Sequence, residues 1–343
     1  MEIFLGILLV ALAGIGTGTC AWPMKMMKKF QFEHFWFIGM AVGLIVVPWL
    51  ITLLFCPHAI EAYKTVDMML LVKANIFAIG WGIANVLYGV CVVRIGAALT
   101  GAILGALGAS VGVIVPMIFK ASGLFGGAPN LNSPTGIVIL AGVAVVVFGI
   151  IIITFAGFGR DRILNTSQQR RSNGFLGGLI MVIIAGVVSC GISFTFIYSQ
   201  GPIVEAMKAN GAGDIAANVA VWAVGLLGGA FVNILYPVYL MTKNKSWGIL
   251  KTSGREIILS AIIGIQFFAA VTLLGRGMIF LGVLGASIGF GIMQSVQILG
   301  NQAVGFISGE WKGVHGKPRR QMYLAIAVLI LAAIIMAYGK SMD

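Results

Sequence analysis

Apolar stretches of about 20 residues recur along this chain, and they limit its fold more than any other feature. Hydrophobic residues make up 59% of the 343 positions and charged residues only 9%, against about a quarter in soluble domains. A soluble core cannot absorb so much apolar surface, whereas a lipid bilayer can. The first 22 residues lack the basic start of a cleavable signal peptide and are long enough to span. The sequence therefore predicts an all-α integral membrane protein.

Windows of roughly 20 apolar residues divide the chain into ten predicted membrane-spanning helices. The third and fourth are almost continuous, and we expect the break between them at Arg94–Ile95–Gly96. The ninth is long and rich in glycine, which favours a tilt or a kink. The predicted spans are residues 3–22, 35–56, 74–93, 95–119, 135–156, 175–199, 215–241, 257–275, 279–308 and 322–339.

The basic residues alternate between successive loops. The odd-numbered loops hold 16 of the 22 Lys and Arg residues, and the even-numbered loops and the C-terminal tail hold 6. Because cytoplasmic loops are enriched in Lys and Arg, the odd loops are predicted to be cytoplasmic and both termini outside. We expect a multi-pass protein of the bacterial cytoplasmic (inner) membrane. The net charge of +12 follows this topology and does not indicate a nucleic-acid partner.

A nonapeptide occurs twice, in equivalent positions of two halves. Leu104–Gly112 reads LGALGASVG and Leu281–Gly289 reads LGVLGASIG, with seven of nine positions identical. The polar stretch 158–174 near the midpoint predicts a cytoplasmic linker between a first repeat, 1–157, and a second repeat, 175–343. Five spans are an odd number, so the second half must enter the membrane in the opposite sense. This pattern predicts two inverted five-helix repeats, with spans four and nine as a close-packed pivot.

Both nonapeptides contain GxSxG, which also occurs around the nucleophile of serine hydrolases. A serine nucleophile needs a base within hydrogen-bond reach, and the three histidines His34, His58 and His315 all lie at predicted membrane edges. No Walker A sequence is present, and the four cysteines show no metal-binding spacing. We therefore predict no enzyme activity, no cofactor and no metal site.

Polar and aromatic side chains within the predicted spans indicate a binding site. In lipid, such side chains face the protein interior or water. Spacings of three or four residues put several of them on one helix face. Amide and hydroxyl groups hydrogen-bond to hydroxyls, and an indole packs on the apolar face of a sugar ring. An equally open interpretation of any one of them is that it ties two helices together. The candidates are Trp81, Asn85, Tyr88, Ser189, Ser193, Asn218, Trp222, Gln266 and Gln294.

None of the ten acidic residues lies at the middle of a predicted span, and no Lys or Arg does. A fixed ionic site for a charged substrate is therefore not expected. If transport is coupled to an ion, the candidate groups are Glu205 and Asp214 near the outer surface and Glu310 at the inner end of span nine. For each of them, the favoured interpretation is a solvated charge at the membrane boundary.

The run FAIGWGIANVLYG, Phe77 to Gly89, resembles the WGIGN-x-x-YG signature of the L-rhamnose–proton symporter family, part of the drug/metabolite transporter superfamily. Weaker elements follow in the same order along nearly the whole chain. The resemblance implies ten helices, outside termini and uptake of a sugar with a proton. The weaker elements are Pro23–Lys29, Gly191–Ser193–Phe194, the acidic pair Glu205 and Asp214, Gln266–Phe267–Phe268, and Glu310–Trp311.

Our hypothesis is a drug/metabolite-type secondary transporter that takes up a small neutral sugar, such as a deoxy hexose, by alternating access. Its partners are this neutral polar solute, the lipid bilayer and a proton as coupling ion. The alternative is a carrier or exporter of another neutral solute, such as a nucleoside, a ureide or an amphipathic compound. A membrane-embedded enzyme would need a titratable cluster in one cavity, and a sensor or scaffold would have a filled core.

Overall fold

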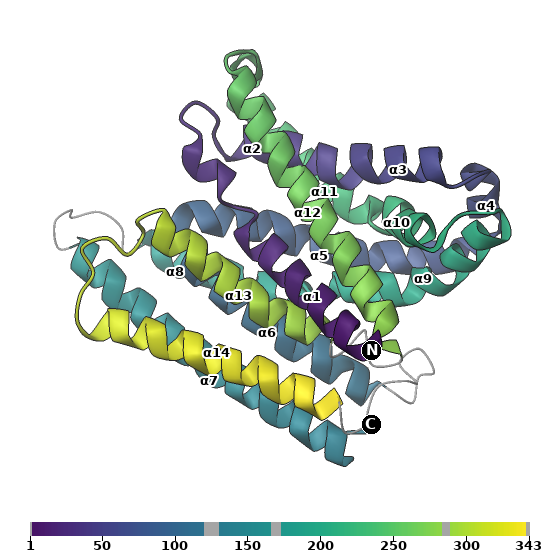
Figure 1. Ribbon diagram of the computed structural model, residues 1–343. Coiled ribbons are helices and arrows are strands. Elements are labelled where there is room, and N and C mark those ends of the chain that lie inside the picture. The colour runs from purple at the N-terminus through teal and green to yellow at the C-terminus, as the bar shows by residue number, and fades with distance from the viewer. Residues whose placement is uncertain (1, 120–129, 166–172, 283–288, 341–343) are drawn as a thin grey trace.

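The computed structural model describes residues 2–119, 130–165, 173–282 and 289–340, and this part of the chain is helical without strands (Figure 1). Most helices run between two opposite ends of a bundle. The α-helices are α1 (Glu2–Thr19), α2 (Phe32–Ala41), α3 (Val47–Phe55), α4 (Ala59–Thr65), α5 (Met68–Ile95), α6 (Ala97–Ile118), α7 (Pro134–Asn165), α8 (Asn173–Val188), α9 (Gly191–Ala209), α10 (Asp214–Gly225), α11 (Leu227–Lys243), α12 (Gly254–Phe280), α13 (Phe290–Ile307) and α14 (Lys317–Lys340). Short turns of other helix types are η1 (Pro23–Met26), η2 (Val42–Val46) and η4 (Trp247–Lys251).

The described helices confirm an all-helical chain suited to a membrane. Seven helical stretches are long and apolar enough to cross a bilayer, and the bent pair α10–α11 would make an eighth. The ninth predicted span is represented by α13, which carries four amide side chains in 18 residues, and this polarity keeps it out of the seven. A total of ten spans therefore stays a prediction.

The predicted break between the third and fourth spans is confirmed. Helix α5 ends at Ile95, Gly96 has φ +91°, and α6 begins at Ala97. Residues other than glycine rarely adopt this backbone conformation, so Gly96 allows the chain to reverse without a loop. The Arg160 guanidinium donates a hydrogen bond to the Ile95 carbonyl oxygen at 3.0 Å, so the last turn of α5 is capped by α7.

Helix α12 continues to Phe280, past the predicted end of span eight near residue 275. Arg276 looked like a loop residue, but its guanidinium lies over the Phe280 ring at 4.8 Å and 3.9 Å from the Asp214 carboxylate. These contacts allow a charged residue to remain in the last turns of an apolar helix. Of the second nonapeptide, residues 283–288 lie outside the described part of the chain.

Several predicted spans are interrupted. Helices α10 and α11 meet at Leu226 with a bend of 52°. Span six breaks between α8 and α9, at Ser189 and Cys190, and span two contains the π-helical turn η2. Helix α7 extends to Asn165, so the first residues of the predicted linker are helical, and residues 166–172 are not described.

The helices pack mostly against partners from the other half of the chain. Helix α7 packs along α14, α6 along α13, and α1 against both α12 and α13. Glycines allow these close approaches: a methyl group added to Gly43 of η2 would lie 2.5 Å from the carbonyl oxygen of Gly264 in α12. Where backbones come this near, dispersion contacts replace the hydrophobic effect that lipid cannot provide.

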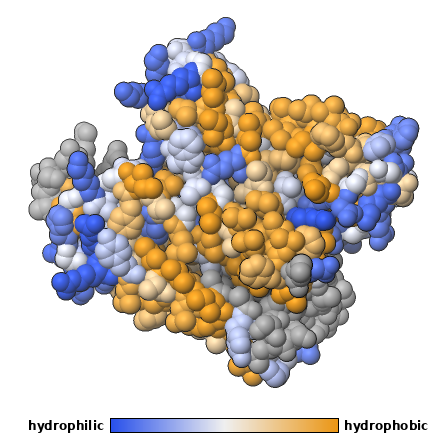
Figure 2. Space-filling model, viewed as in Figure 1, coloured by the Kyte–Doolittle hydropathy of each residue, from blue (hydrophilic) through white to orange (hydrophobic). Residues whose placement is uncertain are grey.

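The bundle has two distinct ends. The connections α1–α2, α11–α12 and α13–α14 lie toward the upper and left side of Figure 1, and we call this the basic end. Both chain ends and α4 lie on the other side, at what we call the terminal end. Figure 2 shows the molecule from the same side as Figure 1. Apolar side chains cover most of the middle of the visible surface, and hydrophilic side chains gather mainly toward the two ends of the bundle. This distribution suits a protein surrounded by lipid.

Candidate functional site

A cavity lies in the middle of the bundle and extends toward the basic end. The space between its lining residues is about 860 Å³, a volume that includes solvent at its open mouth. Among the described residues that line it, no side chain is ionised at neutral pH. The lining comprises Thr17, Cys20, Ala21, Met24, Phe35, Trp36, Met40, Trp81, Ala84, Asn85, Tyr88, Gly89, Val92, Leu104, Ser189, Ile192, Ile263, Phe267, Val271, Leu274, Phe290, Met293, Gln294 and Gln297.

One wall of the cavity is organised by Asn233 of α11, which lies just behind it. The Trp36 indole and the Asn85 amide both donate to the Asn233 side-chain oxygen, each at 2.9 Å. The Asn233 amide in turn donates to the carbonyl oxygen of Gly229 at 2.8 Å. Asn233 is fully buried, so this network fixes the orientation of Trp36 and Asn85.

A second polar group forms where α6 and α13 meet. An added methyl group at Gly108, in the first nonapeptide, would overlap the Gln294 side-chain nitrogen and the Ser189 hydroxyl oxygen. The absence of a side chain at Gly108 therefore makes room for both. Nearby, the Tyr88 hydroxyl donates to the Asn301 side-chain oxygen at 2.7 Å, which links α5 to α13.

The aromatic wall consists of Trp81 and Phe267. Their rings are stacked with centroids 5.7 Å apart and an interplanar angle of 20°. Gly191 allows α9 to reach the backbone of α5 beside Trp81. The cavity thus offers flat ring faces, amides, hydroxyls and apolar side chains, a combination that suits a neutral solute with both hydroxyl groups and hydrocarbon surface.

Comparison with known proteins identifies the family of this chain. The sequence profile described as "L-rhamnose-proton symport protein (RhaT)" matches residues 1–342. The chain belongs to the L-rhamnose-proton symport protein family. Among its relatives, the L-rhamnose-proton symporter of Pectobacterium atrosepticum is 27% identical over 338 residues, covering 96% of both chains. That of Yersinia pestis is 26% identical with the same coverage.

Membership of the L-rhamnose-proton symport protein family makes the chain a membrane transporter and not an enzyme. The local geometry of the first GxSxG agrees with a chain that is not a serine hydrolase. There the Ser110 hydroxyl donates to the Ala106 carbonyl oxygen at 2.9 Å, within its own helix. The resemblance stated from the WGIGN-like run is confirmed along the whole chain.

Five of the nine predicted binding residues of this family member line the cavity: Trp81, Asn85, Tyr88, Ser189 and Gln294. The other four lie outside the lining. Gln266 joins α12 to α1, since it accepts from Trp22 at 3.0 Å and donates to Thr19 at 2.8 Å. Ser193, Asn218 and Trp222 are completely or almost completely buried on α9 and α10.

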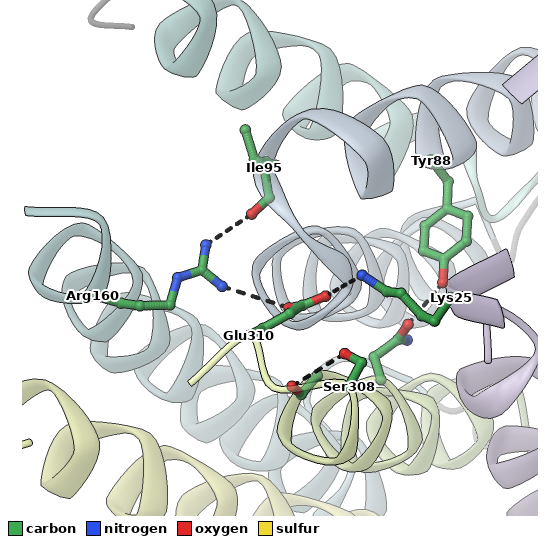
Figure 3. A network of polar contacts seen from close by, with 8 residues as sticks. Lys25, Tyr88, Ile95, Arg160, Ser308 and Glu310 are labelled. Atoms are coloured by element: carbon green, nitrogen blue, oxygen red, sulfur yellow. Dashed lines mark hydrogen bonds and ion pairs between the residues drawn. The ribbon is translucent and has the colours of Figure 1, made fainter. Parts of the chain in front are cut away.

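The three acidic candidates occupy different surroundings. Glu205 is exposed on α9, and Asp214 is half-exposed and pairs with Lys208 at 2.9 Å. Glu310 is mostly buried at the basic end, where its two carboxylate oxygens lie 2.8 Å from the Lys25 ammonium and 3.5 Å from the Arg160 guanidinium (Figure 3). Figure 3 also shows Tyr88, a cavity residue, beside Lys25.

Several lining residues were not predicted from sequence. Trp36 was missed because it lies at the start of span two in an apolar run, where an aromatic residue usually only packs. Phe267 directly follows Gln266 in the motif that was recognised, but neighbouring helical residues point about 100° apart, and it is Phe267 that reaches the cavity. Asn233 was not among the predicted site residues, and its two partners Trp36 and Asn85 come from distant helices.

Proposed function

We propose that this chain is a proton-coupled symporter that takes up a small neutral sugar of the deoxy hexose type by alternating access. The observation that carries the proposal is the central cavity whose described lining holds amide, hydroxyl and aromatic groups but no charge. A buried charge in lipid is costly unless it is paired, so an uncharged pocket favours an uncharged substrate. The relatives over 96% of the chain are named L-rhamnose-proton symporters, which supports both parts of the proposal.

The lining matches the chemistry of a deoxy sugar. Asn85, Gln294 and Ser189 offer hydrogen-bonding groups for ring hydroxyls, while Trp81 and Phe267 offer flat faces for the ring. L-rhamnose carries a methyl group where a hexose has a hydroxymethyl group, and Met40, Met293 and Ile192 supply apolar surface for it. We assign Gln266 and Ser193 to the packing of helices around this site.

Exchanged contacts between the halves support two inverted five-helix repeats of the drug/metabolite transporter type, over 1–157 and 175–343 with 158–174 as the linker. A methyl group added to Gly43 would lie 2.5 Å from the Gly264 carbonyl oxygen, and one added to Gly229 would lie 2.8 Å from that of Ala78. Gly229 lies 186 positions after Gly43, and Gly264 lies 186 positions after Ala78. The contact between spans two and eight thus recurs between spans seven and three.

The state described here has its cavity directed toward the basic end. The lining residues nearest that end are Met24 in η1 and Val92 in α5. The positive-inside rule places a Lys- and Arg-rich end in the cytoplasm. We therefore take this state as open to the cytoplasm, with the site reached from outside only after the halves rock.

Proton coupling is assigned to Glu310. Of the three acidic candidates it is the one that is mostly buried and joined to segments next to the cavity, through Lys25 and Arg160. Exposed Glu205 and Asp214 have no comparable connection. Protonation of Glu310 would release both cations and loosen the basic end, which is the kind of change that could link proton movement to opening.

The alternative is a carrier or exporter of another neutral solute. Many of the cavity residues are apolar, which also suits an amphipathic compound or a nucleoside. Purified protein in proteoliposomes separates these possibilities. We expect uptake of labelled L-rhamnose, accelerated by an inward proton gradient, and weaker competition by L-mannose, which adds one hydroxyl, than by unlabelled L-rhamnose.

The matched variants are Asn85→Ala and Asn210→Ala. Asn85 lies in the cavity wall, whereas Asn210 lies at the end of α9 outside the lining. Loss of one hydrogen-bonding amide from the cavity should weaken sugar binding about tenfold in Asn85→Ala. Sugar binding by Asn210→Ala should equal that of the unmodified protein. Equal binding by both variants removes Asn85 from the site, and transport of nucleosides but no sugar overturns the sugar assignment.

A further inference from the structure

Helix α10, near the terminal end, carries polar side-chain atoms that are buried without partners. Neither the nitrogen nor the oxygen of the Asn218 amide has a hydrogen-bond partner, and the same holds for the Trp222 indole nitrogen. Asn218 is 1% exposed and Trp222 is not exposed at all. Residues four apart share a helix face, so the three atoms lie on one side of α10. Burying such groups unpaired is unfavourable, so this face is better suited to a state in which it meets water or a ligand.

The unpaired face lies directly beyond the cavity. Trp222 stacks on Phe196 with ring centroids 4.8 Å apart. A methyl group added to Gly275 of α12 would meet these two rings at about 3 Å, and the preceding residue, Leu274, lines the cavity. The stacked rings therefore pack against α12 one residue beyond Leu274 of the lining, in the direction of the terminal end.

The same arrangement occurs in the other half, where it borders the cavity. Trp36 packs on Gly89, and Trp222 packs on Gly275, so the partners are 53 positions apart in both pairs, from 36 to 89 and from 222 to 275. Trp222 lies 186 positions after Trp36, and Gly275 lies 186 positions after Gly89. The same offset relates the exchanged glycine contacts described above. Trp36 lines the cavity toward the basic end, whereas Trp222 is fully enclosed. The two tryptophans thus occupy equivalent places on opposite sides of the site.

We propose that Asn218 and Trp222 form an outer sugar-binding site that is closed in this structure and opens when the transporter faces outward. In that state Trp222 lines the outer access path as Trp36 lines the inner one, and the Asn218 amide and Trp222 indole hydrogen-bond the hydroxyls of the entering sugar. This inference rests on the proposed alternating-access function.

The test is accessibility of position 218 from outside. Asn218→Cys in right-side-out membrane vesicles is treated with a hydrophilic, membrane-impermeant maleimide, with and without external L-rhamnose. The described native cysteines, Cys20, Cys56, Cys91 and Cys190, are all buried, so the unmodified protein gives the background. Ala220→Cys is the matched control, because it is fully buried on the opposite side of the same helix. We expect labelling of Asn218→Cys that external L-rhamnose slows, and no labelling of Ala220→Cys.

Two outcomes separate the inference from the proposed function. Asn218→Cys that transports sugar but resists the reagent overturns the outer site and leaves the transport proposal standing. Unmodified protein that moves no neutral sugar overturns the transport proposal itself. If Asn218→Cys does not fold, Trp222→Phe decides, since it keeps an aromatic ring at this position and removes the indole N–H together with the five-membered ring that carries it. We expect a raised KM for external sugar with the affinity for internal sugar unchanged, and an unchanged external KM would overturn the outer site.

Discussion

At the scale of single residues, Gly108 is the position where the repeated nonapeptide meets two polar residues of the cavity lining. The Gln294 amide and the Ser189 hydroxyl fill the space that a side chain would need. Gly108→Ala should displace both and weaken L-rhamnose binding about tenfold or more, because polar groups of the site would lose their alignment. Calorimetric titration of the purified variant measures this.

Gly80→Ala provides the matched control for Gly108→Ala. Gly80 also lies within a helix, α5, but nothing lies within 4 Å of an added methyl group. The control should bind as the unmodified protein does, and both variants should keep a cooperative thermal transition in detergent. Unaltered affinity in a folded Gly108→Ala protein would show that the nonapeptide serves helix packing alone.

Residue-scale features were predictable where one helix contains them. Trp81, Asn85 and Tyr88 follow each other at helical spacing in one recognisable motif, and all three line the cavity. Asn233 was not predictable as the organiser of Trp36 and Asn85, because that role depends on which distant helices meet. Sequence spacing reports neighbours along one helix face but not contacts between helices.

At the scale of elements, Glu310 joins the ends of several helices. It follows α13 and contacts Lys25 in η1 and Arg160 in α7, while Arg160 also caps α5. Glu310→Gln should abolish accumulation driven by a proton gradient but preserve exchange of internal for external sugar, since exchange needs no net proton movement. Both are measured in the same proteoliposomes.

Glu205→Gln is the control for Glu310→Gln, since Glu205 is exposed and unconnected with the cavity. It should retain both accumulation and exchange. Accumulation by Glu310→Gln at the unmodified level would rule out Glu310 as the coupling group. Retained exchange would show that Glu310→Gln is folded. Loss of both accumulation and exchange would instead identify Glu310 as necessary for the basic end of the bundle to form.

Boundaries between elements followed local chemistry only in part. The break at Gly96 was predicted, and its positive φ explains why glycine stands there. The extension of α12 past Arg276 was not, because it depends on the Phe280 ring and the Asp214 carboxylate. The bend at Leu226 is not marked by a proline or a charged residue in the sequence. On its two sides, α10 packs mainly on α9 and α3, whereas α11 packs mainly on α5 and α2.

At the scale of the whole molecule, the position of the termini tests the orientation. Both chain ends lie at the terminal end of the bundle (Figure 1), and the basic loops predict that this end faces outward. Short epitopes added at the N- and C-terminus should both bind antibody on intact spheroplasts, while an epitope inserted after Lys245 should bind only after lysis. Binding at one terminus alone would contradict an even number of crossings, and binding at neither would reverse the orientation.

The interleaving of the halves has a consequence for biosynthesis. The first helix to leave the ribosome, α1, has as its main partners α12 and α13, which begin 252 and 288 residues later. At 5–20 residues per second, on the order of tens of seconds pass before they emerge. Meanwhile Gly14 and Gly18, whose final neighbours are backbone atoms of α13, face lipid or an insertion chaperone. A nascent chain released before its second half is made therefore leaves an unpaired helix that membrane proteases can recognise.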